Sequence, residues 1–147
     1  MAAIPSTAPA LSQDAPQGAR RTLRKVLWGA QILLAVFLFA GSALPKFAGQ
    51  ADAVRTFEEI GWGQWFRYVT GAVEAAGAVG LVVPRLAGLA AAGLVGLMAG
   101  AVATQLLVLD APWAALPAAF AVLFAVIAWD RRAGSRDLLR SLVSPRR

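Results

Sequence analysis

The chain has 147 residues, of which 59% are hydrophobic and 15% are charged, and its mean hydropathy is +0.63. This composition is too apolar for the surface of an ordinary soluble domain and predicts a small all-α membrane protein. The sequence has no cysteine and no histidine, which excludes disulfides, thiol chemistry, His-ligated metal or haem, and Ser-His or Cys-His nucleophile pairs within this chain. We therefore expect no metal site.

The first 25 residues precede any long apolar run. They are rich in Ala, Pro, Ser and Gln and end in a basic cluster. Such a segment predicts a disordered, basic cytoplasmic tail over residues 1–25. The apolar run that follows is too long for the core of a cleaved signal peptide.

Four long apolar runs come next, over residues 26–45, 68–84, 86–109 and 111–129. Each is about long enough to cross a hydrocarbon core roughly 30 Å thick. The second run carries Glu74, and the others carry no charge. These runs predict a membrane domain over residues 26–130, built as a four-transmembrane-helix antiparallel bundle, and a basic cytoplasmic C-terminal tail over residues 131–147.

A short amphipathic segment lies between the first two runs. Val54, Phe57 and Ile60 recur at helical spacing, with charged residues on the opposite side. This pattern predicts a short interfacial helix between spans one and two, at the outer surface of the membrane.

The chain has 14 Lys and Arg residues against eight Asp and Glu residues, which gives a net charge of +6. The basic residues cluster before the first span, in the turn between spans two and three, and after the fourth span, where they flank spans rather than form a nucleic-acid-binding patch. The positive-inside rule places such clusters in the cytoplasm, so we expect an inner-membrane protein with both termini cytoplasmic and no nucleic-acid partner. The residues are Arg20, Arg21, Arg24, Lys25, Arg85, Arg131, Arg132, Arg136, Arg140, Arg146 and Arg147.

Small residues line the third predicted span. Gly88, Gly96 and Gly100 recur at multiples of four, and Gly71 lies in the second span. Glycines on a membrane helix let a neighbouring backbone approach closely. They predict either helix packing inside this bundle or homo-oligomer formation through the same ridge.

Polar residues within the spans give the main indication of a site. Lys46 follows the first apolar run, and a buried carboxylate such as Glu74 normally finds a partner inside a bundle. The predicted topology brings Lys46, Glu74 and Ser42 to one depth, together with Thr104 and Gln105 of span three. Two interpretations stay open: a structural ion pair that fixes helix register, and a cavity for a small polar or quinone-like ligand or for proton transfer.

The stretch "FAGSALPKFAG", followed after an amphipathic segment by "FRYVTGAVEAAGAVGLVVPRLAGLAAAGLVGLMAGAVAT", resembles the DoxX family of small four-helix bacterial membrane proteins. The resemblance covers about residues 26–130. It implies importance for Gly41, Lys46, Gly71 and Glu74. Many relatives carry a histidine near the end of helix three, where this chain has Gln105, and that departure argues against proton-transfer or metal chemistry.

The resemblance implies an accessory or quinone-associated subunit of a membrane redox or oxidative-stress complex, because relatives are described beside such systems. We expect no catalysis by the chain alone, since it would need a bound quinone or the cofactor of a redox-protein partner. The expected partners are the lipid bilayer and either that redox protein or further copies of the chain. The alternatives are a small-molecule transporter with its site at Lys46 and Glu74, and a non-catalytic assembly or structural protein.

Overall fold

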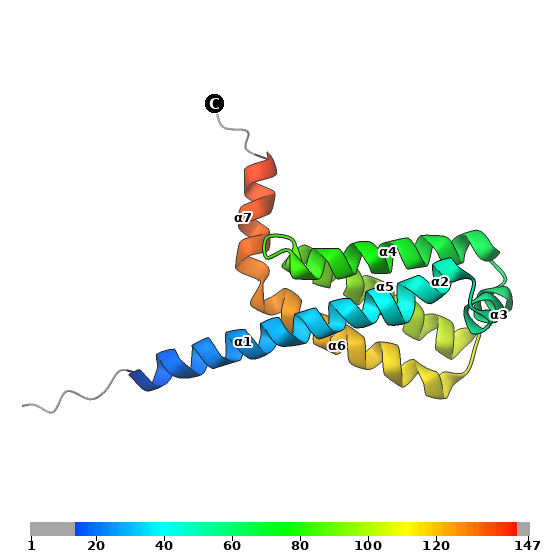
Figure 1. Ribbon diagram of the computed structural model, residues 1–147, viewed down its shortest axis with the longest axis horizontal. Coiled ribbons are helices and arrows are strands. Elements are labelled where there is room, and N and C mark those ends of the chain that lie inside the picture. The colour runs from blue at the N-terminus through cyan, green and yellow to red at the C-terminus, as the bar shows by residue number, and fades with distance from the viewer. Residues whose placement is uncertain (1–13, 144–147) are drawn as a thin grey trace, which may run out of the picture.

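The computed structural model describes residues 14–143, and this part of the chain is helical with no β-strand. In chain order the elements are α1 (Asp14–Val36), η1 (Phe37–Ala43), α2 (Leu44–Ala48), α3 (Ala51–Ile60), α4 (Gln64–Val82), α5 (Ala87–Leu107), η2 (Ala111–Ala114), α6 (Ala115–Asp130) and α7 (Arg132–Val143). Figure 1 shows α1, η1 and α2 as one long rod beside α4, with α5 and α6 completing the bundle. Helix α3 crosses one end of the bundle, and α7 turns away at the other.

Three helical stretches are long and apolar enough to cross a membrane. They are Arg21–Ala48, Ala87–Leu107 and Ala111–Asp130. The sequence predicted four spans, and the second, which corresponds to α4, is not among these three because Arg67 and Glu74 lower its hydropathy.

The first helix begins inside the segment that the sequence predicted to be a disordered tail. Residues 14–25 form the first turns of α1, so that prediction was wrong for them. Their composition is mixed rather than proline-rich, and Thr22 donates a hydrogen bond to the Gly18 carbonyl one turn earlier. The rest of the predicted tail, residues 1–13, lies outside the described residues.

A π-helical segment, η1, interrupts the long rod just before Pro45. A proline lacks the backbone N–H that an α-helix needs, and its ring clashes with the carbonyl four residues earlier. The chain responds by widening the preceding turn, so that the Leu44 N–H bonds to the Phe39 carbonyl five residues back. The rod thus stays continuous while the positions of Ser42 and Lys46 shift relative to a regular helix.

The core lies between the rod, α4, α5 and α6. Helix α5 packs most extensively against α6 and next against α4. Leu38, Leu81, Leu94 and Phe124 are almost fully buried there. Most other large apolar side chains face outward, as expected for helices whose surroundings are hydrocarbon.

Helix α3 has the amphipathic form that the sequence predicted. Phe57 is buried against α4, where its ring lies 5.7 Å from that of Phe66. On the opposite side Arg55 and Glu59 form an exposed ion pair of 3.2 Å. Helix α3 therefore packs against the bundle through one face only.

The glycines fall into two groups. A Cβ at Gly77 would lie 2.6 Å from Leu94 Cδ2, and one at Gly88 would lie 2.0 Å from Ser135 Oγ, so both glycines permit close helix packing. A Cβ at Gly96 or Gly100 would meet nothing within 4 Å. The predicted packing of those two glycines inside the bundle was therefore wrong, because their face of α5 points away from the other helices of this chain.

At Gly41 the nearest neighbour lies in the same rod. A Cβ there would lie 3.3 Å from the ring of Phe37, one turn earlier. The packing role predicted for Gly41 is therefore local to η1.

Candidate functional site

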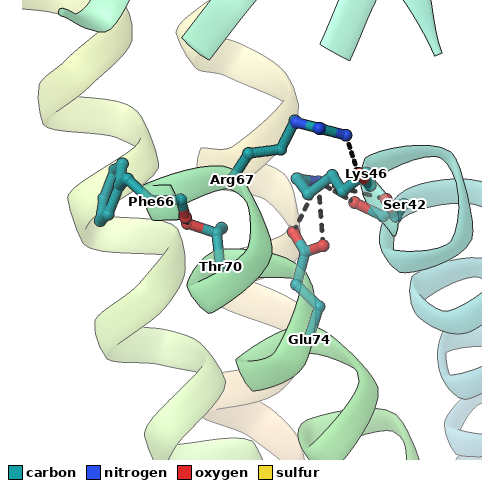
Figure 2. Close-up of polar contacts among 6 residues, drawn as sticks. All are labelled: Ser42, Lys46, Phe66, Arg67, Thr70 and Glu74. Carbon is teal, nitrogen blue, oxygen red and sulfur yellow. Dashed lines mark hydrogen bonds and ion pairs between the residues drawn. The ribbon is translucent and has the colours of Figure 1, made fainter. Parts of the chain in front are cut away.

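The ammonium group of Lys46 lies at the centre of a polar cluster between the rod and α4. Its Nζ is 2.9 Å from Glu74 Oε2 and 3.1 Å from Glu74 Oε1, so it bridges both carboxylate oxygens. Figure 2 shows Lys46 reaching across from the rod to meet Glu74, which rises from α4. An ion pair thus joins two helices that are distant in sequence.

Ser42 completes the surroundings of the lysine. Lys46 Nζ donates to Ser42 Oγ at 2.8 Å and to the Ser42 carbonyl at 3.3 Å. Both acceptors belong to the residue one turn before Lys46 in the same rod. The lysine is therefore held by its own rod as well as by Glu74.

The pair is withdrawn from the surroundings but not sealed. The side chain of Glu74 is 6% exposed and that of Lys46 is 15% exposed. Hydrogen bonds to a carboxylate are strong in such a low-dielectric setting, and leaving the carboxylate unpaired would be costly. The carboxylate is thus nearly enclosed, whereas part of the Lys46 side chain is exposed.

Gly71 makes the close approach of the two helices feasible. A Cβ at this position would lie 3.3 Å from Lys46 Cβ and 3.4 Å from the ring of Phe47. Any larger residue would push α2 away from α4. The glycine that the sequence singled out in span two thus sets the distance across which Lys46 reaches Glu74.

Arg67 is a member of the cluster that sequence reasoning missed. It is 4% exposed, and its Nη1 donates to the Lys46 carbonyl, which anchors the end of α2 to α4. Its Nε donates to Gln64 Oε1 at 2.8 Å and its Nη2 to the Tyr68 hydroxyl at 3.0 Å. An arginine one turn inside α4, rather than in a loop, was the signal that could have identified it.

Thr104 and Gln105 are not brought to this cluster. Thr104 Oγ1 donates within its own helix to the Gly100 carbonyl at 2.9 Å. Among residues 14–143 no hydrogen bond joins either side chain to Lys46 or Glu74. The convergence predicted from depth alone failed because equal depth does not fix which way a side chain points around its helix.

A second polar cluster lies at the opposite end of the bundle, and the sequence analysis did not predict it. Gln31 is 2% exposed; its Nε2 donates to the Leu81 carbonyl at 3.1 Å, and its Oε1 accepts from Arg131 Nη2 at 2.9 Å. The amide therefore ties α1 to α4 and to the α6–α7 junction. A lone amide within an otherwise apolar span was the sequence signal for it.

An apolar groove of about 360 Å³ lies between the rod and α4. Its lining residue Ala78 is one helical turn from Glu74 on α4. The lining residues are Ala35, Val36, Phe39, Ala40, Ala78, Val79 and Val82. An apolar groove near a charged pair suits an amphiphilic ligand.

Among the described residues there is no group of three or more Asp, Glu, His or Cys side chains that could hold a metal ion. Comparison with known proteins finds the DoxX-like family, whose pattern matches residues 30–127. No curated protein and no solved structure matches the chain.

Proposed function

The chain belongs to the DoxX-like family of membrane proteins, and we propose that it is a quinone-associated accessory subunit of a membrane redox complex. In this proposal the chain spans the inner membrane four times as an antiparallel bundle with both termini in the cytoplasm. The chain binds and positions the quinone, and a partner protein supplies the electrons.

The burial of the charges on α4 supports its role as the second of the four spans. Helix α4 has 19 residues, or about 28 Å at 1.5 Å per residue, close to the thickness of a hydrocarbon core. Its two charged residues, Arg67 and Glu74, are 4% and 5% exposed. Exposed positions such as Val69, Val73 and Val79 are apolar. Lipid would therefore meet an apolar surface although the helix carries charge.

The observation that carries the quinone proposal is the apolar groove between the rod and α4, because its lining residue Ala78 lies one helical turn from Glu74 of the Lys46–Glu74 pair. An ammonium group can donate a hydrogen bond to a quinone carbonyl. The apolar groove is suited to an isoprenoid tail. The Lys46 side chain is 15% exposed, so it is not fully enclosed by the bundle.

The chemistry of a quinone fits the residues present. A bound quinone takes up two electrons and two protons to become a quinol. This chain has no cysteine or histidine to carry a redox centre, so the electrons come from a partner. Lys46 would orient the headgroup, and the Glu74 carboxylate beside it is the nearest group able to accept or release a proton.

A structural role for the pair is the second candidate, and one observation favours it. Every polar contact that Lys46 makes is already satisfied within the chain, by both Glu74 oxygens and by Ser42. A lysine so fully bonded can serve simply to lock α2 against α4. In that case the chain is an assembly protein whose groove holds only lipid.

Photolabelling distinguishes these candidates. The full chain in lipid nanodiscs is illuminated with an azido-ubiquinone, with and without excess decylubiquinone. We expect labelling that decylubiquinone suppresses, on peptides of the rod and α4, and a loss of about tenfold or more in Lys46→Met.

Arg55→Met is the matched control, because it removes an outer-side cation that is exposed on α3 and remote from the groove. It should label like the wild type. Labelling that is not suppressed by decylubiquinone, or that is equal in Lys46→Met and the wild type, would exclude the quinone site and leave the structural role.

A further inference from the structure

A basic cleft of about 820 Å³ opens at the end of the bundle opposite the Lys46–Glu74 pair. Its walls come from the first turns of α1, the turn between α4 and α5, and the junction of α6 and α7. The lining includes Arg21, Arg24, Lys25, Trp28, Pro84 and Arg131. Segments from three parts of the chain thus bring four cations to one cavity.

The cations of α1 lie on one helical face. Arg21 is three residues from Arg24 and four from Lys25, and like charges at these spacings repel one another on an isolated helix. The ion pairs found within residues 14–143 join Lys46 to Glu74, Arg55 to Glu59 and Arg131 to Asp130, so none of them neutralises this face. An external anion would relieve the repulsion.

Arg131 is the fixed member of the cleft. Its Nη2 is held by the buried amide of Gln31, whereas its Nε is buried, makes no hydrogen bond, and lies 3.6 Å from Asp130 Oδ2. A guanidinium that is pre-positioned in this way is suited to a phosphate group, because its planar fork matches the phosphate oxygens. The charge of Asp130 offsets only one of the four cations.

The surface next to the cleft favours a lipid over a soluble anion. Trp28 is 45% exposed at the rim, and an indole prefers the headgroup level of a bilayer. One turn further along α1, Ile32 and Leu33 are 36% and 72% exposed, and Val36 follows at 59%. The cationic face therefore continues directly into an apolar face on which acyl chains can lie.

We propose that this cleft is a binding site for the phosphate headgroup of an anionic phospholipid. Arg21, Arg24 and Lys25 supply the attraction, Arg131 fixes the phosphate, and the apolar face of α1 receives the acyl chains. This site is independent of the Lys46–Glu74 pair and does not depend on the proposed function.

Native mass spectrometry of the full chain in detergent tests the proposal, because it resolves each bound lipid by mass. The chain is titrated separately with phosphatidylglycerol, phosphatidylcholine and inorganic phosphate. We expect phosphatidylglycerol to bind at least about tenfold more tightly than phosphatidylcholine. Each cation contributes about a fivefold change near an anionic surface, so Arg24→Gln with Lys25→Gln should weaken phosphatidylglycerol binding about 30-fold.

The matched control is Arg136→Gln with Arg140→Gln, which removes two exposed cations of α7 that do not line the cleft. It should leave the phosphatidylglycerol affinity unchanged. An equal loss in both double variants would show diffuse attraction and overturn the site. Equal binding of the two lipids by the wild type would also overturn it, and this comparison does not depend on any variant folding. Inorganic phosphate binding as tightly as phosphatidylglycerol would refute the lipid assignment.

Discussion

Replacing Lys46 by methionine leaves the carboxylate of Glu74 without a partner. Both hydrogen bonds that the carboxylate receives within residues 14–143 come from Lys46 Nζ, at 2.9 and 3.1 Å, and the Glu74 side chain is 6% exposed. The converse change, Glu74→Gln, is milder. Lys46 would keep its bonds to Ser42 and its 15% exposure. The structure therefore predicts unequal effects for the two single variants.

The size of each effect follows from burial. Breaking a buried ion pair by removing one partner costs about 3 to 5 kcal/mol of unfolding free energy. We expect Lys46→Met to fall in that range and Glu74→Gln to cost about 2 kcal/mol, because the ammonium group can hydrate. The double variant has no unpaired charge, so it should be more stable than the sum of the single effects predicts, by at least about 2 kcal/mol.

Unfolding in mixed micelles by titration with sodium dodecyl sulfate measures these free energies. The exposed Arg55–Glu59 pair on α3 is the matched control, because Arg55→Met with Glu59→Gln also replaces a basic residue by Met and a glutamate by Gln, where the side chains are 80% and 52% exposed. Its coupling should be about 0.5 kcal/mol or less. Coupling at Lys46–Glu74 no larger than in this control would refute the reasoning from burial.

Three further predictions concern other parts of the chain. Gly77→Ala should lower the melting temperature in detergent, because the added Cβ would lie 2.6 Å from Leu94, whereas Gly96→Ala, which faces open space, should not; equal losses would contradict this packing. Gln31→Leu should lower the unfolding free energy by about 1 to 3 kcal/mol, because it breaks two buried hydrogen bonds; an unchanged value would show that this amide does not tie the helices together. A reporter fused after Arg147 should be active only as a cytoplasmic reporter, and a periplasmic signal would refute the topology of four spans with both termini in the cytoplasm.

Much of the fold could be predicted because a helix that crosses the hydrocarbon core of a membrane needs an apolar run of a certain length. Apolar runs of membrane length and the periodicity of Val54 and Phe57 indicated helices close to those observed. What failed was the start of the first helix at Asp14 and the orientation of Gly96. Neither follows from hydropathy, since the first depends on local helix propensity and the second on rotation of α5 about its own axis.

The candidate site could also be predicted only in part from the sequence. A lone carboxylate in a span must find a partner, and this argument leads from the sequence to Glu74 and Lys46. Predicted depth in the membrane also placed Gln105 in the cluster, but within residues 14–143 its side chain makes no hydrogen bond to Lys46 or Glu74. Arg67 and Gln31 were missed because the first lies at the start of α4, beside the polar connection, and the second is uncharged. Which polar groups meet depends on helix rotation and on the π-helical turn, and these are set by packing across the whole bundle.

The most direct test of the account measures quinone labelling in the double variant Lys46→Met with Glu74→Gln. This variant should recover much of the stability lost in the single variants, so a defect in binding cannot be attributed to unfolding. We expect a folded chain whose azido-ubiquinone labelling has lost the component that decylubiquinone suppresses. A double variant that is stable and labels like the wild type would contradict a role for the pair in quinone binding.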